Sequence, residues 1–526
     1  MNLLIVKKKL FLIIILSSFL INSFNLKDYG YAWDDYLMRY TGFVNLKYII
    51  KKINPNIEEK YDSLKKIQNL NEWRDKYYGP SFETTAAIIE ILSNNFETNK
   101  SNYENNSNNY YLRCFILIFL MHLSYFFFFK TSQHITKNNF LSTIGLLVLI
   151  SYPRFFAEQH YNTRDLYLCG LAIMCIYFGS KILNKIKIKN IILFSLFCGI
   201  AISTRISSLI IPFSLIFLLL FKESFNLNKI IWGFVIILFV IFSTFINFPF
   251  LWENPLQNSL EVFQKLSNHS WRGNVLYFGK YYKSIELPWH YILSWYFLTT
   301  PITYSLIFLF TVIFAVRKIY DGGLSNIKKN IITHKYFYLN FGIFIFALFL
   351  IIIFQKTKYN GWRHSYFLFI FFLYSILYFV NTISLQKIKN FIYLILILTV
   401  SLNLHWIYRN HPYQNLYFNF IIKEPYKQFD MDWWGLTNID ILKYLLNYDK
   451  SQEIKIWAAS GTSLEATKTL LTEDERKRIK VVKLESEANY ILNNYINNQI
   501  DYSTKYLLIK EIKVSGNKVN SLYKIF

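Results

Sequence analysis

Cysteine is scarce in this sequence, and the placement of the few that occur excludes several kinds of site. Only four cysteines occur among 526 residues, and no two have the C-x-x-C spacing of zinc and redox sites. All four lie in or beside apolar runs, so we interpret them as small apolar side chains rather than disulfide partners or metal ligands. They are Cys114, Cys169, Cys175 and Cys198.

Signatures of several common enzyme and transporter classes are missing as well. The sequence contains no P-loop, no zincin or zinc-finger spacing and no G-x-S-x-G elbow. No apolar run carries the in-line series of acids or bases that a proton pathway across a membrane requires. These absences weigh against a pump or a secondary transporter.

Long apolar runs are abundant in the sequence. Hydrophobic residues make up 53% of the chain and aromatic residues 20%, with only 10 prolines and 17 glycines. A helix crosses a bilayer with about 20 apolar residues, so we predict a polytopic α-helical membrane protein with about eleven transmembrane helices. The predicted spans are residues 10–26, 111–129, 140–152, 166–182, 191–204, 207–221, 230–250, 291–316, 336–354, 365–380 and 391–407.

The net charge of +24 could suggest binding to nucleic acid. Many of the basic residues, however, lie in short loops between the apolar runs, which is the pattern that sets the orientation of a membrane protein. If the N-terminus is cytoplasmic, the segments on that side hold 18 Lys or Arg and only two acids, Glu223 and Asp321. The same orientation places the C-terminus and all the unusual segments on the outer side.

The outer side includes a long first loop and a long tail. In the loop, residues 27–110, the apolar spacing predicts surface helices over 34–53 and from Ser81 to Leu92, followed by an Asn-rich connector. In the tail, β-rich runs such as 454–457 alternate with helical pieces such as 486–498.

A hairpin turn is predicted at 515–517, and together these patterns indicate a small soluble α/β domain. The predicted organisation is a transmembrane domain over 1–407 and an outer-face α/β domain over 408–526.

Two adjacent acids open the first outer loop. Asp34 and Asp35 follow the first apolar run closely and are flanked by Tyr31, Trp33 and Tyr36, aromatics that favour a membrane interface. One interpretation is a catalytic base at the membrane surface, kept ionised by a helix N-terminus. The other is an ordinary helix N-cap.

The loop over residues 152–167 places polar side chains between two spans with almost no spacer. Charged groups at this depth normally face a cavity within the protein, so Arg154 could meet an anion and Asp165 a sugar hydroxyl. The alternative is an Arg–Asp pair that only stabilises the loop.

Two further outer segments carry arginine. Arg205 stands alone between two spans, where it either snorkels to lipid headgroups or binds a phosphate. Arg363 and His364, together with Lys356 and Lys358, form a cationic cluster that would suit an anionic partner such as a lipid-linked phosphate. Contact with lipid headgroups is the alternative for this cluster.

Aromatic segments of the outer side have two interpretations. Trp252-Glu253-Asn254-Pro255 and Asp430-Met431-Asp432-Trp433-Trp434 resemble sugar-binding surfaces, and they equally resemble an interfacial aromatic belt.

The order and sidedness of these motifs resemble a known superfamily. The acidic pair after the first span, the Pro-Arg-Phe…Asn-x-x-Asp loop ending at Asp165 and the late Trp-Arg-His loop are similar to motifs of the GT-C membrane glycosyltransferases. Within that superfamily the chain resembles the bacterial group related to glycosyltransferase family 39 and the protein O-mannosyltransferases. The resemblance covers residues 1 to about 440.

The resemblance implies a reaction and a set of roles. An inverting enzyme of the bacterial inner membrane would move a sugar from a polyprenyl-phosphate donor to a lipid, glycan or protein acceptor on the periplasmic side. Asp34 would be the base, and Asp35 stands where relatives usually carry Glu. Asp165 would match the acid of the second outer loop, and Arg205 and Arg363 would hold the donor phosphate.

Three points stay open at this stage. Some relatives use a divalent metal near the acids, and Asp34 and Asp35 could ligate one, although nothing in the sequence demands it. A transporter or flippase for a lipid-linked saccharide is an alternative function, and a non-catalytic partner of a glycan-assembly complex is another. The donor sugar and the acceptor are not specified by any residue pattern.

Overall fold

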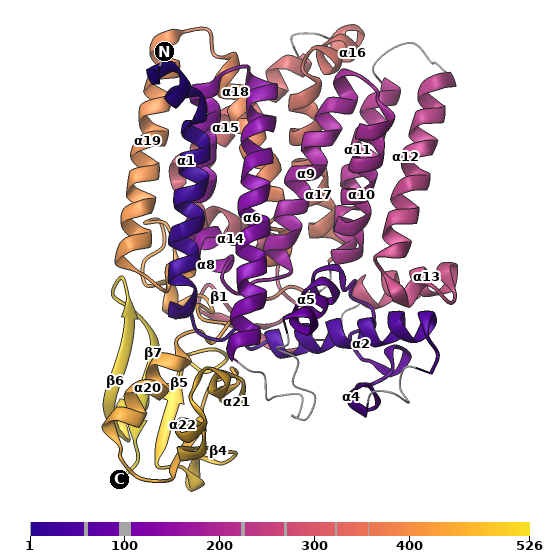
Figure 1. Cartoon of the computed structure of the whole chain (residues 1–526). Coiled ribbons are helices and arrows are strands. Elements are labelled where there is room, and N and C mark those ends of the chain that lie inside the picture. The colour runs from indigo at the N-terminus through magenta and orange to yellow at the C-terminus, as the bar shows by residue number, and fades with distance from the viewer. Residues whose placement is uncertain are drawn as a thin grey trace.

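The computed structural model describes residues 2–56, 62–93, 107–221, 227–267, 271–320, 323–355 and 357–526. Most of the Asn-rich connector lies outside these ranges, as do Glu223, Asp321 and Lys356. The described residues form a bundle of long helices with a unit of strands and short helices at one end (Figure 1).

Apolar helices build the bundle and confirm the predicted fold class. Within the described ranges, seven helices are long and apolar enough to cross a membrane, and four further apolar helices are shorter. The long ones are α1 (Asn2–Phe24), α6 (Ser107–Thr136), α9 (Asp165–Asn184), α12 (Leu227–Ile246), α15 (Ile302–Tyr320), α17 (Lys335–Phe354) and α19 (Gln386–Arg409). The shorter ones are α7 (Asn139–Ile150), α10 (Ile188–Thr204), α11 (Ile210–Phe221) and α18 (Leu368–Thr382).

The bundle departs from the prediction at one span. A single span over 291–316 is wrong, because the structure has α14 (Tyr291–Thr299) and α15 with Pro301 between them. Proline has no N–H to donate and its ring clashes with the preceding turn, so the helix ends there. The break predicted at Arg205 is confirmed, since α10 ends at Thr204 and a 3-10 turn leads into α11.

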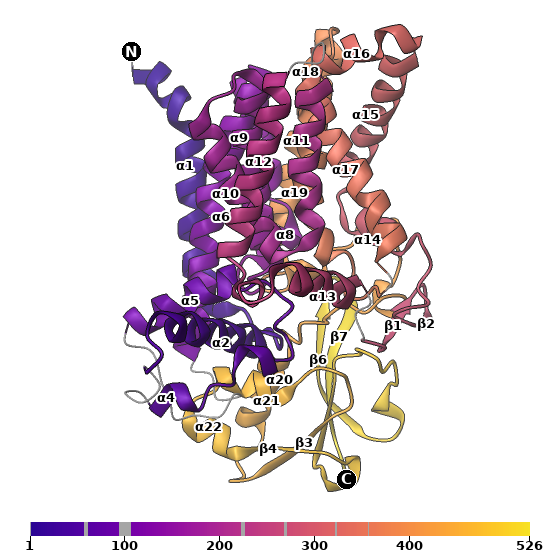
Figure 2. The same cartoon turned by 90° about the vertical axis from the view of Figure 1, so that its right-hand side faces the viewer.

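The segments predicted to share one side do collect at one end of the bundle, opposite the N-terminus (Figure 1). In the first loop, α2 (Asp35–Ile53) and α5 (Ser81–Leu92) confirm the two predicted surface helices, and α4 (Asp62–Lys65) lies between them in the chain. Figure 2 shows α2 and α13 (Pro255–Ser267) lying across the ends of the upright helices. Which end faces the cytoplasm stays a prediction.

Two smaller elements complete the ends of the bundle. The hairpin of β1 (Asn274–Tyr277) and β2 (Lys280–Lys283) lies at the tail end, and α16 (Gly323–Thr333) lies at the N-terminal end (Figure 2).

The tail forms a five-stranded mixed sheet in the order β4-β3-β5-β7-β6. Its strands are β3 (Ile454–Ala458), β4 (Ile479–Val482), β5 (Tyr490–Asn493), β6 (Leu507–Val514) and β7 (Asn517–Lys524), and its helices are α20 (Asn438–Tyr448), α21 (Leu464–Thr467) and α22 (Glu473–Arg478). β3 pairs in parallel with β4 and β5, while β7 pairs antiparallel with β5 and β6.

Apolar side chains of α20 and the sheet share one buried cluster, which includes Leu442 and Leu445 with Ile454 and Ile456. These contacts confirm the predicted small α/β unit. The hairpin turn at Ser515 and Gly516 is confirmed as well. The helix predicted over 486–498 is wrong, because β5 occupies that segment.

Candidate active site

A polar cavity of about 850 Å³ lies between the first loop, the end of the bundle and the tail. Its walls come from distant parts of the sequence. They include Trp33, Asp34, Arg74, Asp75, Tyr77 and Tyr78 of the first loop, Lys265, Arg272 and Asn274 near α13 and β1, Tyr359, Asn360 and Arg363 after α17, and Asp430, Trp433, Thr462 and Asn497 of the tail.

Asp34 faces this cavity and forms an ion pair there. It occupies the position before α2 without accepting a capping hydrogen bond through its side chain. Instead, Arg363 Nη2 donates to Asp34 Oδ2 at 3.3 Å. Its carboxylate is therefore turned away from the helix end and toward the cavity, so the N-cap interpretation of this side chain is wrong.

Asp35 does not line the cavity, although it is the next residue. Its carboxylate is buried under the first loop, where Arg113 Nε of α6 lies 3.4 Å from Oδ1. Burial raises the pKa of Asp35, and the Arg113 charge opposes that rise. Glu90 of α5 joins the same buried group, since it lies 3.8 Å from Arg113 and accepts a hydrogen bond from Arg39 at 2.9 Å.

A second ion pair stands beside the first. Arg205 donates to Asp165 Oδ1 through Nε at 2.7 Å and also through Nη2. Burial by itself would lower the pKa of Arg363, but the charges of Asp34 and Asp165 raise it above its ordinary value. The structure therefore brings Asp34, Arg363, Asp165 and Arg205 into one electrostatic group, and Arg205 pairs within the protein instead of snorkelling.

Arg154 and His364 lie outside this group. Arg154 is buried against the rings of Trp295, Phe418 and Trp433, and its Nη2 donates to the Tyr417 carbonyl at 3.2 Å. These contacts fix the loop to the tail segment. His364 is half-buried, with its ring 5.0 Å from that of Tyr359, and neither Arg154 nor His364 lines the cavity.

The loop over residues 152–167 does not contain the internal Arg–Asp pair considered from the sequence. Asp165 pairs with Arg205, and Arg164 pairs instead with Glu83 of α5, with 3.1 Å between Nη2 and Oε1. Both pairs connect the loop to other elements, so they fix the positions of the walls around the cavity.

Sequence reasoning missed two buried acids near the site. Glu158, at the end of α8 (Pro153–Glu158), accepts hydrogen bonds from Tyr366 at 2.6 Å and from Asn162 at 2.7 Å, and burial raises its pKa to about 7. Asp430 lines the cavity; its Oδ2 accepts the Leu276 amide at 3.0 Å, and burial raises its pKa to about 7. Each belongs to a polar segment that the sequence made conspicuous, but no residue pattern indicated burial.

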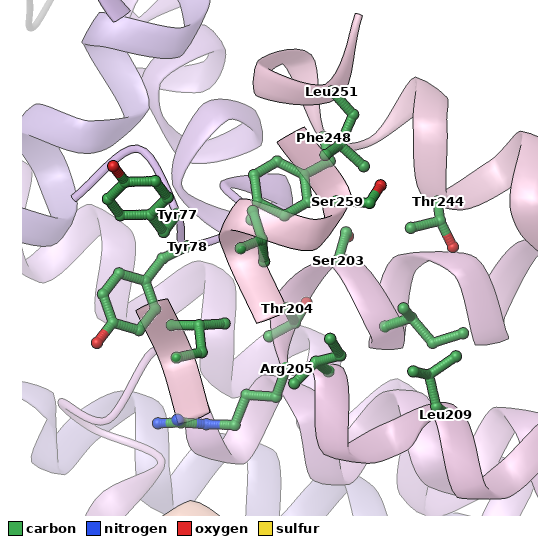
Figure 3. Close-up of a pocket in the computed structure, with 15 residues that line it drawn as sticks. Tyr77, Tyr78, Ser203, Thr204, Arg205, Leu209, Thr244, Phe248, Leu251 and Ser259 are labelled. Carbon is green, nitrogen blue, oxygen red and sulfur yellow. The ribbon is translucent and has the colours of Figure 1, made fainter. Parts of the chain in front are cut away.

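An apolar pocket of about 180 Å³ adjoins the polar cavity, with Tyr77, Tyr78 and Leu266 lining both. Its other walls come mainly from the end of α10 and the 3-10 turn that follows it, from the segment between Thr244 and Leu251, and from α13. Figure 3 shows Arg205 at one edge of this pocket, with its guanidinium on the side of Tyr78. A cationic group thus stands where the apolar pocket meets the polar cavity.

Contacts with the tail hold the start of the first loop in place. Tyr29 donates to Gln414 Oε1 at 3.0 Å, and the Trp33 amide donates to the Trp434 carbonyl at 3.4 Å. Gly30 packs directly on the backbone of Leu436, and a Cβ added there would lie 2.1 Å from the carbonyl oxygen. The position of Asp34 therefore depends on residues about 400 positions later in the chain.

The acidic pair does not fit a shared metal ion. Asp34 pairs with Arg363 and Asp35 with Arg113, and only Asp34 lines the cavity. In the described residues, no three side chains of His, Cys, Asp or Glu gather as metal ligands would.

Residues 82–248 match the family model of the dolichyl-phosphate-mannose-protein mannosyltransferases. This match covers less than half of the 526 residues and supports the predicted resemblance over that part of the chain.

Two solved structures are similar over nearly the whole chain. They are crystal structures of ArnT from Cupriavidus metallidurans, one bound to undecaprenyl phosphate and one in the apo state. Each is 11% identical with a TM-score of 0.46; the first covers 98% of both chains and the second 97%. At this identity and score, the likeness by itself defines neither the activity nor the ligands of this chain. No curated protein matches the chain.

Proposed function

We propose that this protein is an inverting glycosyltransferase that moves a sugar from a polyprenyl-phosphate donor to an acceptor on the outer face of the bacterial inner membrane. The observation that carries the proposal is the Asp34–Arg363 ion pair in the polar cavity, with Asp165–Arg205 beside it. In this proposal the N-terminus is cytoplasmic, the tail is periplasmic, and the acceptor is a lipid, a glycan or a protein.

The junction of the two cavities supports a donor that is apolar at one end and anionic at the other. The apolar pocket suits the first isoprene unit of a lipid tail, because its lining includes the apolar side chains of Ile202, Leu209 and Val262. The phosphate would then lie near Arg205, within the field of Arg363. Arg363 Nε is buried and has no hydrogen-bond partner among the described residues, so it can donate to a phosphate oxygen.

Asp34 is placed to act as the general base. The acceptor hydroxyl gives its proton to the Asp34 carboxylate while its oxygen forms a bond to the anomeric carbon of the sugar. The bond from that carbon to the phosphate oxygen breaks on the opposite face, and the electron pair leaves with the polyprenyl phosphate. Arg363 and Arg205 stabilise the charge that develops on this leaving group.

Asp35 and the remaining predicted residues have positioning roles in this proposal. Asp35 anchors the start of α2 to Arg113 on α6 and thereby orients the neighbouring Asp34. Asp165 holds Arg205, and Arg154 fixes its loop against the tail through three aromatic rings. His364 packs on Tyr359, a residue of the cavity wall.

The proposal is tested by Asp34→Asn, with Asp75→Asn as the matched control. Asp75 also lines the cavity, but its partner Arg74 is largely exposed to solvent. We expect transfer of a labelled sugar from polyprenyl phosphate to fall on the order of 10²-fold or more in the first variant, because the base is lost. The second variant should transfer normally.

Equal transfer by Asp34→Asn and the unchanged protein, both inserted and folded, would refute the role of Asp34. A transporter or flippase would instead move the lipid-linked saccharide across a vesicle membrane without any change in its covalent structure. Profiling lipid-linked glycans of a deletion strain would then identify the sugar and the acceptor together.

A further inference from the structure

A basic cavity of about 400 Å³ lies at the other end of the bundle, opposite the candidate active site (Figure 1). It is formed where α6 ends, α7 begins and α9 ends. Its walls are Lys130, Gln133, His134, Lys137, Asn139, Tyr177, Ser180 and Lys181. Among the described residues, no acid lines this cavity.

The positive charges of this cavity are not neutralised within the described part of the chain, where Lys130, Lys137 and Lys181 form no salt bridge. The Lys130 ammonium stands over the ring of Phe11 at 5.0 Å, and Lys181 donates to the Tyr177 hydroxyl at 2.6 Å. Lys335 at the start of α17 adds to the positive charge that acts on His134. Like charges that share one cavity repel each other unless an anion offsets them.

The backbone adds a second observation at Lys137. This residue follows the end of α6 with a φ of 57°, in the left-handed region that favours glycine or asparagine. A long basic side chain at such a position is unusual, and strained residues of this kind gather at ligand-binding sites. Here the strain coincides with a wall of the basic cavity.

The orientation of membrane proteins explains why lysines occur at this end, but not why they converge on one cavity. Lys387 and Lys389 belong to the same end of the bundle, yet neither lines it. Lys389 donates instead to the Asn381 carbonyl at 3.0 Å. The general charge bias of this end therefore does not explain why the lysines converge on one cavity.

We propose that this cavity binds a phosphate-bearing anion, and that its occupant in the membrane is the headgroup of an anionic phospholipid. Lysine ammonium groups and a tyrosine hydroxyl supply the donors, and the apolar helices around the cavity suit the attached acyl chains. The site is independent of the sugar-transfer reaction, because it lies at the opposite end of the bundle.

Thermal unfolding of the full-length protein in detergent tests the proposal. We expect phosphatidylglycerol to raise the midpoint by several degrees, because a ligand that binds only the folded state stabilises it, and phosphatidylcholine to have a smaller effect. Lys137→Gln combined with Lys181→Gln should remove the difference between the two lipids. The matched control, Lys387→Gln combined with Lys389→Gln, should keep it.

Native mass spectrometry of the unmodified protein with an equimolar mixture of the two lipids gives a readout that needs no variant. Preferential retention of phosphatidylglycerol supports the site, and equal retention overturns it. Equal lipid responses of the two double variants would also overturn it. If inorganic phosphate stabilises the protein as strongly as phosphatidylglycerol does, the anion site stands and a soluble phosphate replaces the phospholipid as its occupant.

Discussion

Asp34 and Asp35 are neighbours in the sequence, and their side chains lie in different environments. Successive side chains of a helix point about 100° apart, so two adjacent residues at a helix start rarely share one environment. Here Asp34 faces a polar cavity and Asp35 faces the buried guanidinium of Arg113. The sequence could indicate that an acid would lie at the membrane surface, but not which of the two would face the cavity.

Arg363 carries the first prediction at this scale. Replacing it with alanine removes the ion-pair partner of Asp34 and the group proposed to donate a hydrogen bond to the phosphate. We therefore expect kcat/KM for the polyprenyl-phosphate sugar to fall on the order of 10²-fold or more. Lysine at the same position keeps the charge without the forked geometry and should restore only part of the loss. Arg74→Ala changes an exposed arginine of the same cavity and serves as the control.

Glu158 gives a prediction about pH. Burial raises its pKa from 4.5 to about 7, so the folded state binds a proton more tightly than the unfolded state does. Stability from this group is then complete below pH 4.5 and is lost as the pH rises toward 7. Glu158→Gln does not undergo that loss. The difference in thermal midpoint, variant minus unchanged protein, should therefore increase as the pH is raised from 5 to 8.

A control for the pH measurement is Glu465→Gln, since the Glu465 side chain is about half exposed. Its midpoint should follow that of the unchanged protein at every pH. Parallel curves for Glu158→Gln and the unchanged protein would show that Glu158 titrates normally.

At the scale of elements, a buried charge group joins the surface helices α2 and α5 to the membrane helix α6. Arg113 is fully buried between Asp35 and Glu90. Replacing it with alanine leaves two carboxylates without their shared cation, and breaking a buried pair in this way costs about 3–5 kcal/mol. We expect a lowered thermal midpoint for Arg113→Ala, and almost no change for Arg74→Ala, whose side chain is 64% exposed.

Helix α13 has two apolar faces that were not predicted from the sequence. Leu256, Leu260 and Phe263 form an exposed apolar stripe, while Val262 and Leu266 line the apolar pocket. The spacing of these apolar residues is that of an amphipathic helix, whereas the prediction for this loop was based on the aromatic segment that begins at Trp252. A helix lying across the bundle end with such a stripe is suited to the membrane interface.

This placement predicts a chain-length effect for Leu260→Asp. A charge in the stripe should weaken the contact of α13 with lipid and disturb the pocket beside it, so KM for a long-chain polyprenyl donor should rise several-fold. KM for a short, water-soluble donor should stay the same. Gln257→Asp adds the same charge beside the stripe and is the control. An equal rise in KM for the long-chain donor in both variants would show that the stripe is not responsible for the effect.

At the scale of the whole molecule, apolar runs and basic loops were sufficient to predict the bundle and its two ends. The span over 291–316 was misjudged because a run of apolar residues does not show where a proline will separate two helices. The cavity itself could not be predicted, because its walls come from segments as distant as Asp34 and Asp430. Only the folded chain brings them together.

The junction between the first loop and the tail offers a whole-molecule test. A methyl group at Gly30 would collide with the Leu436 carbonyl, so Gly30→Ala must separate the loop from the tail. We expect sugar transfer to fall at least tenfold although neither proposed catalytic arginine nor Asp34 is changed. Gly342→Ala is the control, since a Cβ there has open space around it; full activity of Gly30→Ala would mean that the junction does not position Asp34.

The same junction constrains when the protein becomes functional during its synthesis. Tyr29 and Trp33 leave the ribosome before their partners Gln414 and Trp434, which emerge about 400 residues later. At roughly 5–20 residues per second, that delay is on the order of a minute. A nascent chain that stalls in the membrane before Gln414 and Trp434 are made therefore lacks the contacts that hold Asp34 in place.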